Sequence, residues 1–145
     1  MTSANTINNG SCLCGAIRYT LNGKPMTTVL CHCKNCKKSS GSSFQANLFF
    51  KQDQLTFLSG EDTLRKYQDH DTNSCGAPLR MFCSVCGSNV ITTNEQSDFV
   101  RGNVIVMSGC LEGVTSFEPE LEFYCKDKCG FVDVKTKTQK YEKMT

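Results

Sequence analysis

The sequence predicts a single, mainly β domain built around two metal sites. Short segments rich in β-branched and aromatic residues recur along the chain, and clusters of glycine, serine, asparagine and aspartate separate them, as turns separate strands. The 145 residues suffice for one hydrophobic core, and no linker or internal repeat divides them, so we expect one domain over residues 1–145. Cysteine occurs 11 times, and most of these residues stand in three tight clusters, as metal ligands often do.

Two segments near the N-terminus predict a hairpin. Residues 16–21 and 27–30 have the composition of strands, and the sequence Asn-Gly-Lys-Pro at 22–25 provides a turn between them. A helical turn fits only at residues 34–40, where a run of serine and glycine ends it. The other expected strands are residues 44–50, 54–58, 64–68, 79–82, 89–93, 103–108, 121–124 and 131–135.

The segment 44–50 alternates between apolar and polar residues. Its even-numbered positions are apolar and share one face, whereas Gln45 and Asn47 fall on the other. The last stretch, residues 135–145, is polar and carries four lysines. We therefore expect a folded core over residues 10–134 and a solvated tail that frays.

Two pairs of cysteines predict a closed metal site. Cys12 and Cys14 are followed by a glycine, and so are Cys83 and Cys86. Paired cysteines at this spacing turn both sulfurs toward one ion, and the glycine permits the corner that such a knuckle requires. Joined together, the pairs give a Cys₄ set, the usual composition of a structural zinc site. The alternative, a redox-active Cys-x-x-Cys, needs a βαβ setting that a β-rich chain does not offer.

A third cluster predicts an open metal site. Cys31, Cys33 and Cys36 stand within six residues and can bind one ion from a single loop. Three protein ligands leave the fourth position free, which distinguishes catalytic from structural zinc. His32 could be a fourth ligand, a group that faces the substrate, or a plain loop histidine, and we favour the last.

The remaining cysteines are scattered along the chain. Cys75, in a polar loop before the knuckle at residues 83–86, could close the open site while substrate is absent, or it could have no role. We assign no role to Cys110, Cys125 and Cys129.

Composition narrows the classes of function. The net charge of +2 is too balanced to indicate nucleic acid as a partner, and no apolar run is long enough to cross a membrane. The first twelve residues lack the charged start and apolar stretch of a signal peptide, and the cysteine count is odd. We therefore expect a cytoplasmic protein with reduced thiols that bind metal, rather than a secreted disulfide scaffold.

Three stretches of this sequence resemble the glutathione-dependent formaldehyde-activating enzyme family, also called centromere protein V-like. They are GSCLCGAIRY, CHCKNCKKSSGSSFQANLFF and RMFCSVCGSNV, and the similarity runs from Gly10 to about Val134. The resemblance implies an Mss4-like β-tent fold with two Zn²⁺ ions per chain. It implies a closed site formed by Cys12, Cys14, Cys83 and Cys86, and an open, catalytic one formed by Cys31, Cys33 and Cys36. The activity it implies is condensation of glutathione with formaldehyde, formally that of a carbon–sulfur lyase.

The leading hypothesis is thus a zinc-dependent carbon–sulfur lyase whose partner is a small thiol such as glutathione. Three lysines that flank the open site, Lys34, Lys37 and Lys38, could meet the carboxylates of a tripeptide, or they could belong to a solvated loop, which we favour. The alternative is a non-enzymatic, zinc-stabilised interaction module, and a weaker third hypothesis is redox or metal-buffering work. The sequence names neither the electrophile nor the oligomeric state.

Overall fold

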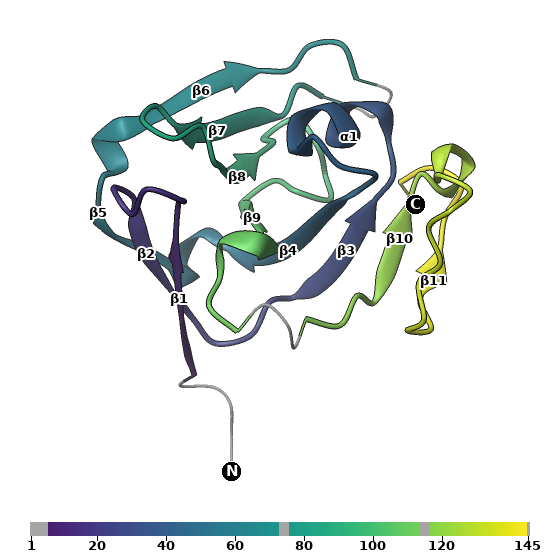
Figure 1. Cartoon of the computed structure of the whole chain (residues 1–145), viewed down its shortest axis with the longest axis horizontal. Helices are drawn as coiled ribbons and strands as arrows, with labels where there is room; N and C mark the ends of the chain where they lie inside the picture. The colour runs from purple at the N-terminus through teal and green to yellow at the C-terminus, as the bar shows by residue number, and fades with distance from the viewer. Residues whose placement is uncertain (1–5, 73–75, 114–116, 145) are drawn as a thin grey trace.

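The chain folds into two β-sheets, as Figure 1 shows for a computed structural model that describes residues 6–72, 76–113 and 117–144. The smaller sheet is antiparallel and has the order β1 (Ile7–Ser11), β2 (Arg18–Asn22) and β5 (Leu55–Ser59). The larger sheet has the order β11-β10-β3-β4-β9-β8-β7-β6. In chain order its strands are β3 (Thr27–Cys31), β4 (Gln45–Lys51), β6 (Leu64–Gln68), β7 (Leu79–Cys83), β8 (Asn89–Thr93), β9 (Asn103–Met107), β10 (Leu121–Phe123) and β11 (Gln139–Lys140).

Helical structure is short. The helix α1 (Lys34–Ser40) follows β3, and Gly41 ends it in the left-handed conformation. Most strand pairs are antiparallel, but β10 runs parallel to both β3 and β11. Short 3₁₀ helices in the described residues include η1 (Gln52–Gln54), η2 (Glu61–Thr63), η3 (Ser108–Cys110) and η5 (Cys125–Asp127).

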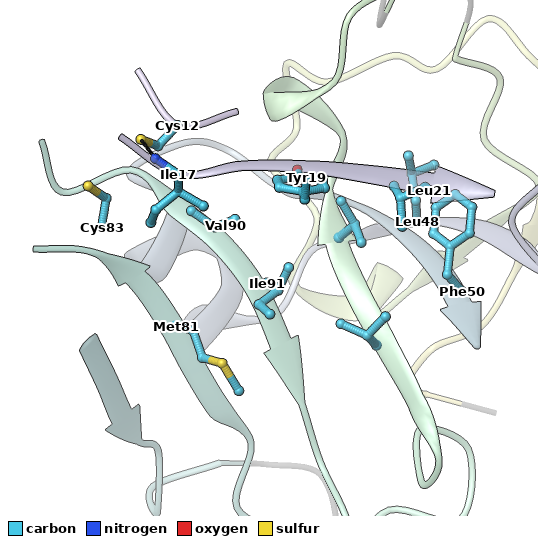
Figure 2. Packing of buried hydrophobic residues seen from close by; sticks show 12 residues of the cluster. Cys12, Ile17, Tyr19, Leu21, Leu48, Phe50, Met81, Cys83, Val90 and Ile91 are labelled. Atoms are coloured by element: carbon cyan, nitrogen blue, oxygen red, sulfur yellow. Dashed lines mark hydrogen bonds between the residues drawn. The ribbon is translucent and has the colours of Figure 1, made fainter. Parts of the chain in front are cut away.

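The main hydrophobic core lies between the two sheets. Tyr19 and Leu21 of β2 pack toward Leu48 and Phe50 of β4, and all four side chains are buried (Figure 2). Gly10 on β1 gives Tyr19 its space, because a Cβ at that position would lie 2.3 Å from the tyrosine ring. The core therefore needs a glycine on the neighbouring strand.

A second core lies on the opposite face of the larger sheet. Successive side chains of a strand point to opposite faces, so Phe49 enters this second cluster while Leu48 and Phe50 enter the first. The expected alternation in this segment is present, and its polar side, Gln45 and Asn47, is also buried. The strand β4 is thus covered on both faces.

The mainly β fold predicted from the sequence is confirmed, and so is the short helix at residues 34–40. The expected strands between residues 44 and 124 all occur, with ends that differ from the expectation by no more than a residue. Two short strands were not expected, β1 and β11. The sequence of β1, INNGS, is polar, and its pairing with β2 gives it its place.

The predicted hairpin of residues 16–21 with 27–30 is wrong. β2 pairs with β1 and β5, whereas β3 pairs with β4 and β10, so the turn between β2 and β3 carries the chain from one sheet to the other. At this turn the amide of Gly23 donates to the carbonyl of Thr6, which precedes β1 of the smaller sheet. The amide of Met26 donates to the carbonyl of Phe49, which lies in β4 of the larger sheet. The segment therefore satisfies its backbone groups without closing a hairpin.

Two expectations for the C-terminal part are also wrong. Residues 131–135 form no strand, and Phe131 at their start is 80% exposed. The tail that was expected to fray instead forms β11, and the ring of Tyr141 packs at 5.8 Å from that of Phe123. Its polar residues made it look solvated, but Thr138 is buried and its hydroxyl bonds to Glu122.

In the described parts of the chain, the helices are all too short and too polar to cross a membrane.

Candidate functional site

The two cysteine pairs predicted to form a closed site come together at one end of the main core. The sulfur atoms of Cys12, Cys14, Cys83 and Cys86 all lie within 4.8 Å of one another. Cys12 and Cys83 are buried and lie at the same end of the cluster in Figure 2. The loop after β1 is thereby joined to the end of β7, so this group links the smaller sheet to the larger one.

Glycines shape both knuckles. Gly15 has φ +79° and donates its amide proton to the carbonyl of Cys12 at 3.1 Å. Gly87 has φ +78° and donates to the carbonyl of Cys83 at 2.8 Å. These left-handed conformations fit glycine, as the sequence pattern indicated, and they turn each pair of sulfurs toward a common point.

The four thiols of the closed group do not ionise alike. Burial raises the pKa of Cys12, but the Ile17 amide and the thiols of Cys14 and Cys83 outweigh it, so the net shift is downward. The pKa of Cys14 moves the other way, to about 11: the backbone bond from Ala16 lowers it, but burial and the neighbouring thiols outweigh that bond. The group cannot hold four negative charges by itself, and a bound dication would allow all four to ionise.

The third cluster forms a separate group of three sulfurs. Cys31 ends β3, Cys33 caps the N-terminus of α1, and Cys36 lies in the first turn of that helix. Their sulfurs lie within 4.8 Å of one another, and the amide of Cys36 donates to the sulfur of Cys33 at 3.3 Å. Among the residues with described positions, no further cysteine, histidine or carboxylate joins this group. Cys75, which we considered as a fourth ligand, lies outside the described residues.

The three thiols of this group shift the pKa values of one another. Hydrogen bonds from Cys31 and Cys36 lower the pKa of Cys33 to about 2. The pKa of Cys36 is raised to about 12. The hydrogen bond from Cys31 lowers this pKa, but the proximity of Cys33 and burial together outweigh that bond. The pKa of Cys33 is thus lowered and those of Cys31 and Cys36 are raised, and a bound cation would favour the ionised form of all three.

His32 does not belong to the metal group. Its side chain is fully buried, and its Nε2 lies 2.8 Å from Oε1 of Glu122 on the neighbouring strand β10. The interpretation of His32 as a plain loop residue is therefore wrong, and the ligand alternative finds no support in this arrangement. Burial lowers the pKa of His32 although Glu122 opposes the shift.

Glu122 is the centre of a buried ionic cluster that the sequence did not reveal. Its Oε1 lies 3.0 Å from Nζ of Lys128, and its Oε2 lies 3.7 Å from Nζ of Lys140 and accepts from Thr138. Burial alone would raise the pKa of Glu122, but the bonds from Thr138, Lys128 and His32 outweigh it and hold the pKa at about 2. Its partners lie far apart in the sequence, so no local pattern could have identified them.

A cavity of about 80 Å³ lies beside the three-thiol group. The odd-numbered face of β4 forms part of its wall, which explains why the polar residues of that face are buried. The polar residues that line it are Asn35, Gln45, Asn47, Thr72, Arg80, Thr92 and Asn94. The other lining residues are Cys31, Cys33, Cys36, Phe49, Pro78, Val100, Ile105, Phe123, Tyr124 and Met144.

Among the described residues that line the cavity, Arg80 is the one with a cationic side chain. It comes from β7 and is 9% exposed, and its Nε lies 3.0 Å from Oδ2 of Asp69. Asn35 donates to both oxygens of the same carboxylate, at 3.1 and 3.0 Å. Burial lowers the pKa of Arg80, but the neighbouring Cys36 and Asp69 outweigh it, so the guanidinium stays charged beside the thiols.

The three lysines considered as substrate contacts do not line the cavity. Lys34 and Lys38 are exposed on α1, and Lys37 donates to the carbonyl of Asp127. The three other described cysteines stay outside both sulfur groups. Each has a backbone carbonyl near its sulfur: Asn89 for Cys110, Glu122 for Cys125 and Ser43 for Cys129.

Comparison with known proteins shows the family of this chain. The model of the family described as glutathione-dependent formaldehyde-activating enzyme matches residues 7–127. A search of curated proteins found no match. A crystal structure of a Rhodobacter sphaeroides protein, a structural-genomics target, is similar with a TM-score of 0.58 and 20% identity over 77% of this chain and 97% of that chain. That likeness concerns the fold, and the expected Mss4-like class is confirmed. Because the family match covers most of the sequence, the chain belongs to the glutathione-dependent formaldehyde-activating enzyme family.

Proposed function

We propose that this protein is a zinc-dependent carbon–sulfur lyase that acts on a small thiol adduct, of the glutathione and S-hydroxymethylglutathione type. One observation carries the proposal: a group of three thiols, with no fourth ligand among the described residues, opens onto a cavity. The family match supports a reaction of glutathione with formaldehyde. The class of reaction and the substrate are our inference.

The donor sets fit two zinc ions with different roles. Cys12, Cys14, Cys83 and Cys86 would hold a structural ion, because four thiolates fill a tetrahedral shell. The three thiols of Cys31, Cys33 and Cys36 would hold the second ion. That ion, when bound, supplies an open coordination position and a Lewis acid that lowers the pKa of a thiol.

The side chains around the cavity provide a small reaction space. In the direction of synthesis, the thiol sulfur bonds to the carbonyl carbon of formaldehyde, and the proton that the thiol loses ends on the carbonyl oxygen. Phe49, Ile105 and Phe123 exclude water from one side of this space. The amides of Gln45 and Asn47 lie on the wall that adjoins the thiols and can orient a hydroxyl or carbonyl group.

The charge of Arg80 supports the same proposal. Three thiolates around a dication leave a net negative charge, and a substrate thiolate adds another. The guanidinium of Arg80 lies at this cavity and is fixed by Asp69, so it stabilises negative charge there without having to move. We also propose a cytoplasmic setting, because seven clustered thiols have to stay reduced to bind metal.

The alternative, a zinc-stabilised interaction module, is less well supported. Such a module needs the closed group alone, and three further thiols beside a cavity would have no use in it. The lysine-bearing tail, which favoured this alternative in the sequence, is partly engaged, since Lys128 and Lys140 pair with Glu122.

Exchange spectroscopy by NMR tests the proposal. Zinc-loaded wild-type protein is expected to accelerate exchange between glutathione, formaldehyde and their adduct, and Cys36→Ser is expected to reduce exchange to the spontaneous rate. Cys110→Ser is the matched control, because Cys110 is half-buried and outside both sulfur groups. If wild-type protein never exceeds the spontaneous rate, the lyase assignment is wrong.

A further inference from the structure

The C-terminal segment of residues 138–144 forms part of the wall of the cavity. It lies beyond Asp127, where the match to the family model ends. Figure 1 shows β11, which belongs to this segment, alongside β10. Met144 lines the cavity together with Cys31 and Cys36 of the open group.

Backbone hydrogen bonds hold this segment in place almost to its last residue. β11 pairs with β10, and beyond it the amide of Tyr141 donates to the carbonyl of Glu122 at 2.9 Å. The amide of Tyr124 in turn donates to the carbonyl of Lys143 at 2.8 Å. Lys143 immediately precedes Met144, so the backbone that carries the methionine is fixed.

The buried ionic cluster fastens the same segment to the open group. Thr138, in the segment, donates to one oxygen of Glu122, and His32 lies 2.8 Å from the other. His32 stands between Cys31 and Cys33 in the sequence. The C-terminal segment and the three-thiol group are thus both attached to the buried carboxylate of Glu122, which fixes the segment relative to the three thiols.

The size of the cavity limits which part of a thiol can enter it. About 80 Å³ is a small space for a bound molecule. Pockets that bury a whole drug-sized ligand measure roughly 300–1,000 Å³. A thiol can therefore bring in only its sulfur and a compact group attached to it, while the rest of the molecule stays outside.

We propose that Met144 is a specificity-determining residue that restricts the site to thiols whose sulfur carries a compact aliphatic group. The inference rests on the proposed function, since it requires a thiol in the cavity. The side chain of Met144 is half-buried and packs against the buried cluster that contains Cys31, Cys36 and Phe123. Its truncation to alanine removes three heavy atoms from the wall and opens space for a bulkier group.

Binding measurements on the zinc-loaded full chain test this inference without measuring activity. Isothermal titration calorimetry compares 2-mercaptoethanol, which is compact, with phenylmethanethiol, which carries a ring. In Met144→Ala the affinity for phenylmethanethiol is expected to rise at least about tenfold, while that for 2-mercaptoethanol changes little. Met26→Ala is the matched control, because Met26 is 45% exposed and does not line the cavity.

The outcomes separate this inference from the function on which it rests. If glutathione exchange stays at the spontaneous rate, the proposed function fails and this inference fails with it. If exchange is accelerated but wild-type protein binds neither small thiol, only this inference fails. If the compact thiol binds and Met144→Ala leaves the discrimination unchanged, only the role of Met144 is wrong. Met144→Phe provides an opposite test, since a larger side chain in the wall is expected to weaken the binding of both thiols.

Discussion

Replacing Cys83 by serine should unfold the protein, whereas the same change at Cys36 should leave it folded with one zinc ion. Cys83 is fully buried at the end of β7, where its group joins the two sheets. A structural zinc site contributes apparent binding free energies of roughly 10–16 kcal/mol in small zinc-binding peptides. A domain of this size has a net stability of roughly 5–15 kcal/mol. The loss of half of the zinc contribution would therefore remove most of the free energy that keeps the chain folded.

The open group contributes to folding differently. Cys36 belongs to a group that one short stretch of chain supplies, so its metal does not join distant strands. The serine hydroxyl at this buried position is expected to cost about 1–3 kcal/mol, which a domain with an intact closed site tolerates. The fold thus survives the loss of this ligand.

Circular dichroism, guanidinium unfolding and metal analysis on the purified variants check the difference. Cys110→Ser serves as the control for a half-buried cysteine outside both groups. A Cys83→Ser protein that keeps the wild-type midpoint of unfolding would refute the structural role of the closed site. So would a wild-type protein whose stability is indifferent to removal of its metal.

Three further predictions follow from buried contacts. Gly10→Ala places a methyl group against the ring of Tyr19 and should lower the free energy of unfolding by about 1–3 kcal/mol; an unchanged denaturation midpoint would contradict this packing. Glu122→Gln should lose up to roughly 3 kcal/mol at neutral pH, because the folded pKa of about 2 lies below the usual 4.5. The difference from wild type should shrink as pH falls from 4.5 toward 2, and a difference that grows on acidification would reverse the assigned sign. Arg80→Met leaves Asp69 charged and buried without its cationic partner and should lower the free energy of unfolding by about 3–5 kcal/mol. Adding Asp69→Asn to the same chain should partly restore this stability, as measured by thermal unfolding.

Sequence reasoning succeeded where local signals determine structure. Glycines after Cys14 and Cys86 identified both knuckles, because the left-handed corner at Gly15 and Gly87 is a local requirement. The alternating pattern of residues 44–50 predicted the strand β4, because this signal also depends only on residues close together in the sequence. The spacing of the cysteines also anticipated the two sulfur groups that the fold brings together.

It failed where partners come from distant parts of the chain. The buried role of His32 depends on Glu122, and that of Arg80 depends on Asp69, and neither pairing leaves a periodic signal. The tail looked solvated because it is rich in lysine, but Thr138 and Lys140 find the same buried carboxylate. The turn after Asn22 had the composition of a hairpin, and only the competition between two sheets decides where β3 pairs.

The most direct test of the account is the position of a substrate sulfur relative to the three-thiol group. Crystals of the protein grown with zinc and soaked with glutathione would be measured at the zinc absorption edge. The account predicts two anomalous peaks per chain, one of them among Cys31, Cys33 and Cys36, with the glutathione sulfur about 2.3 Å from that ion. A single peak at the closed group, or a glutathione sulfur bound away from the metal, would contradict it.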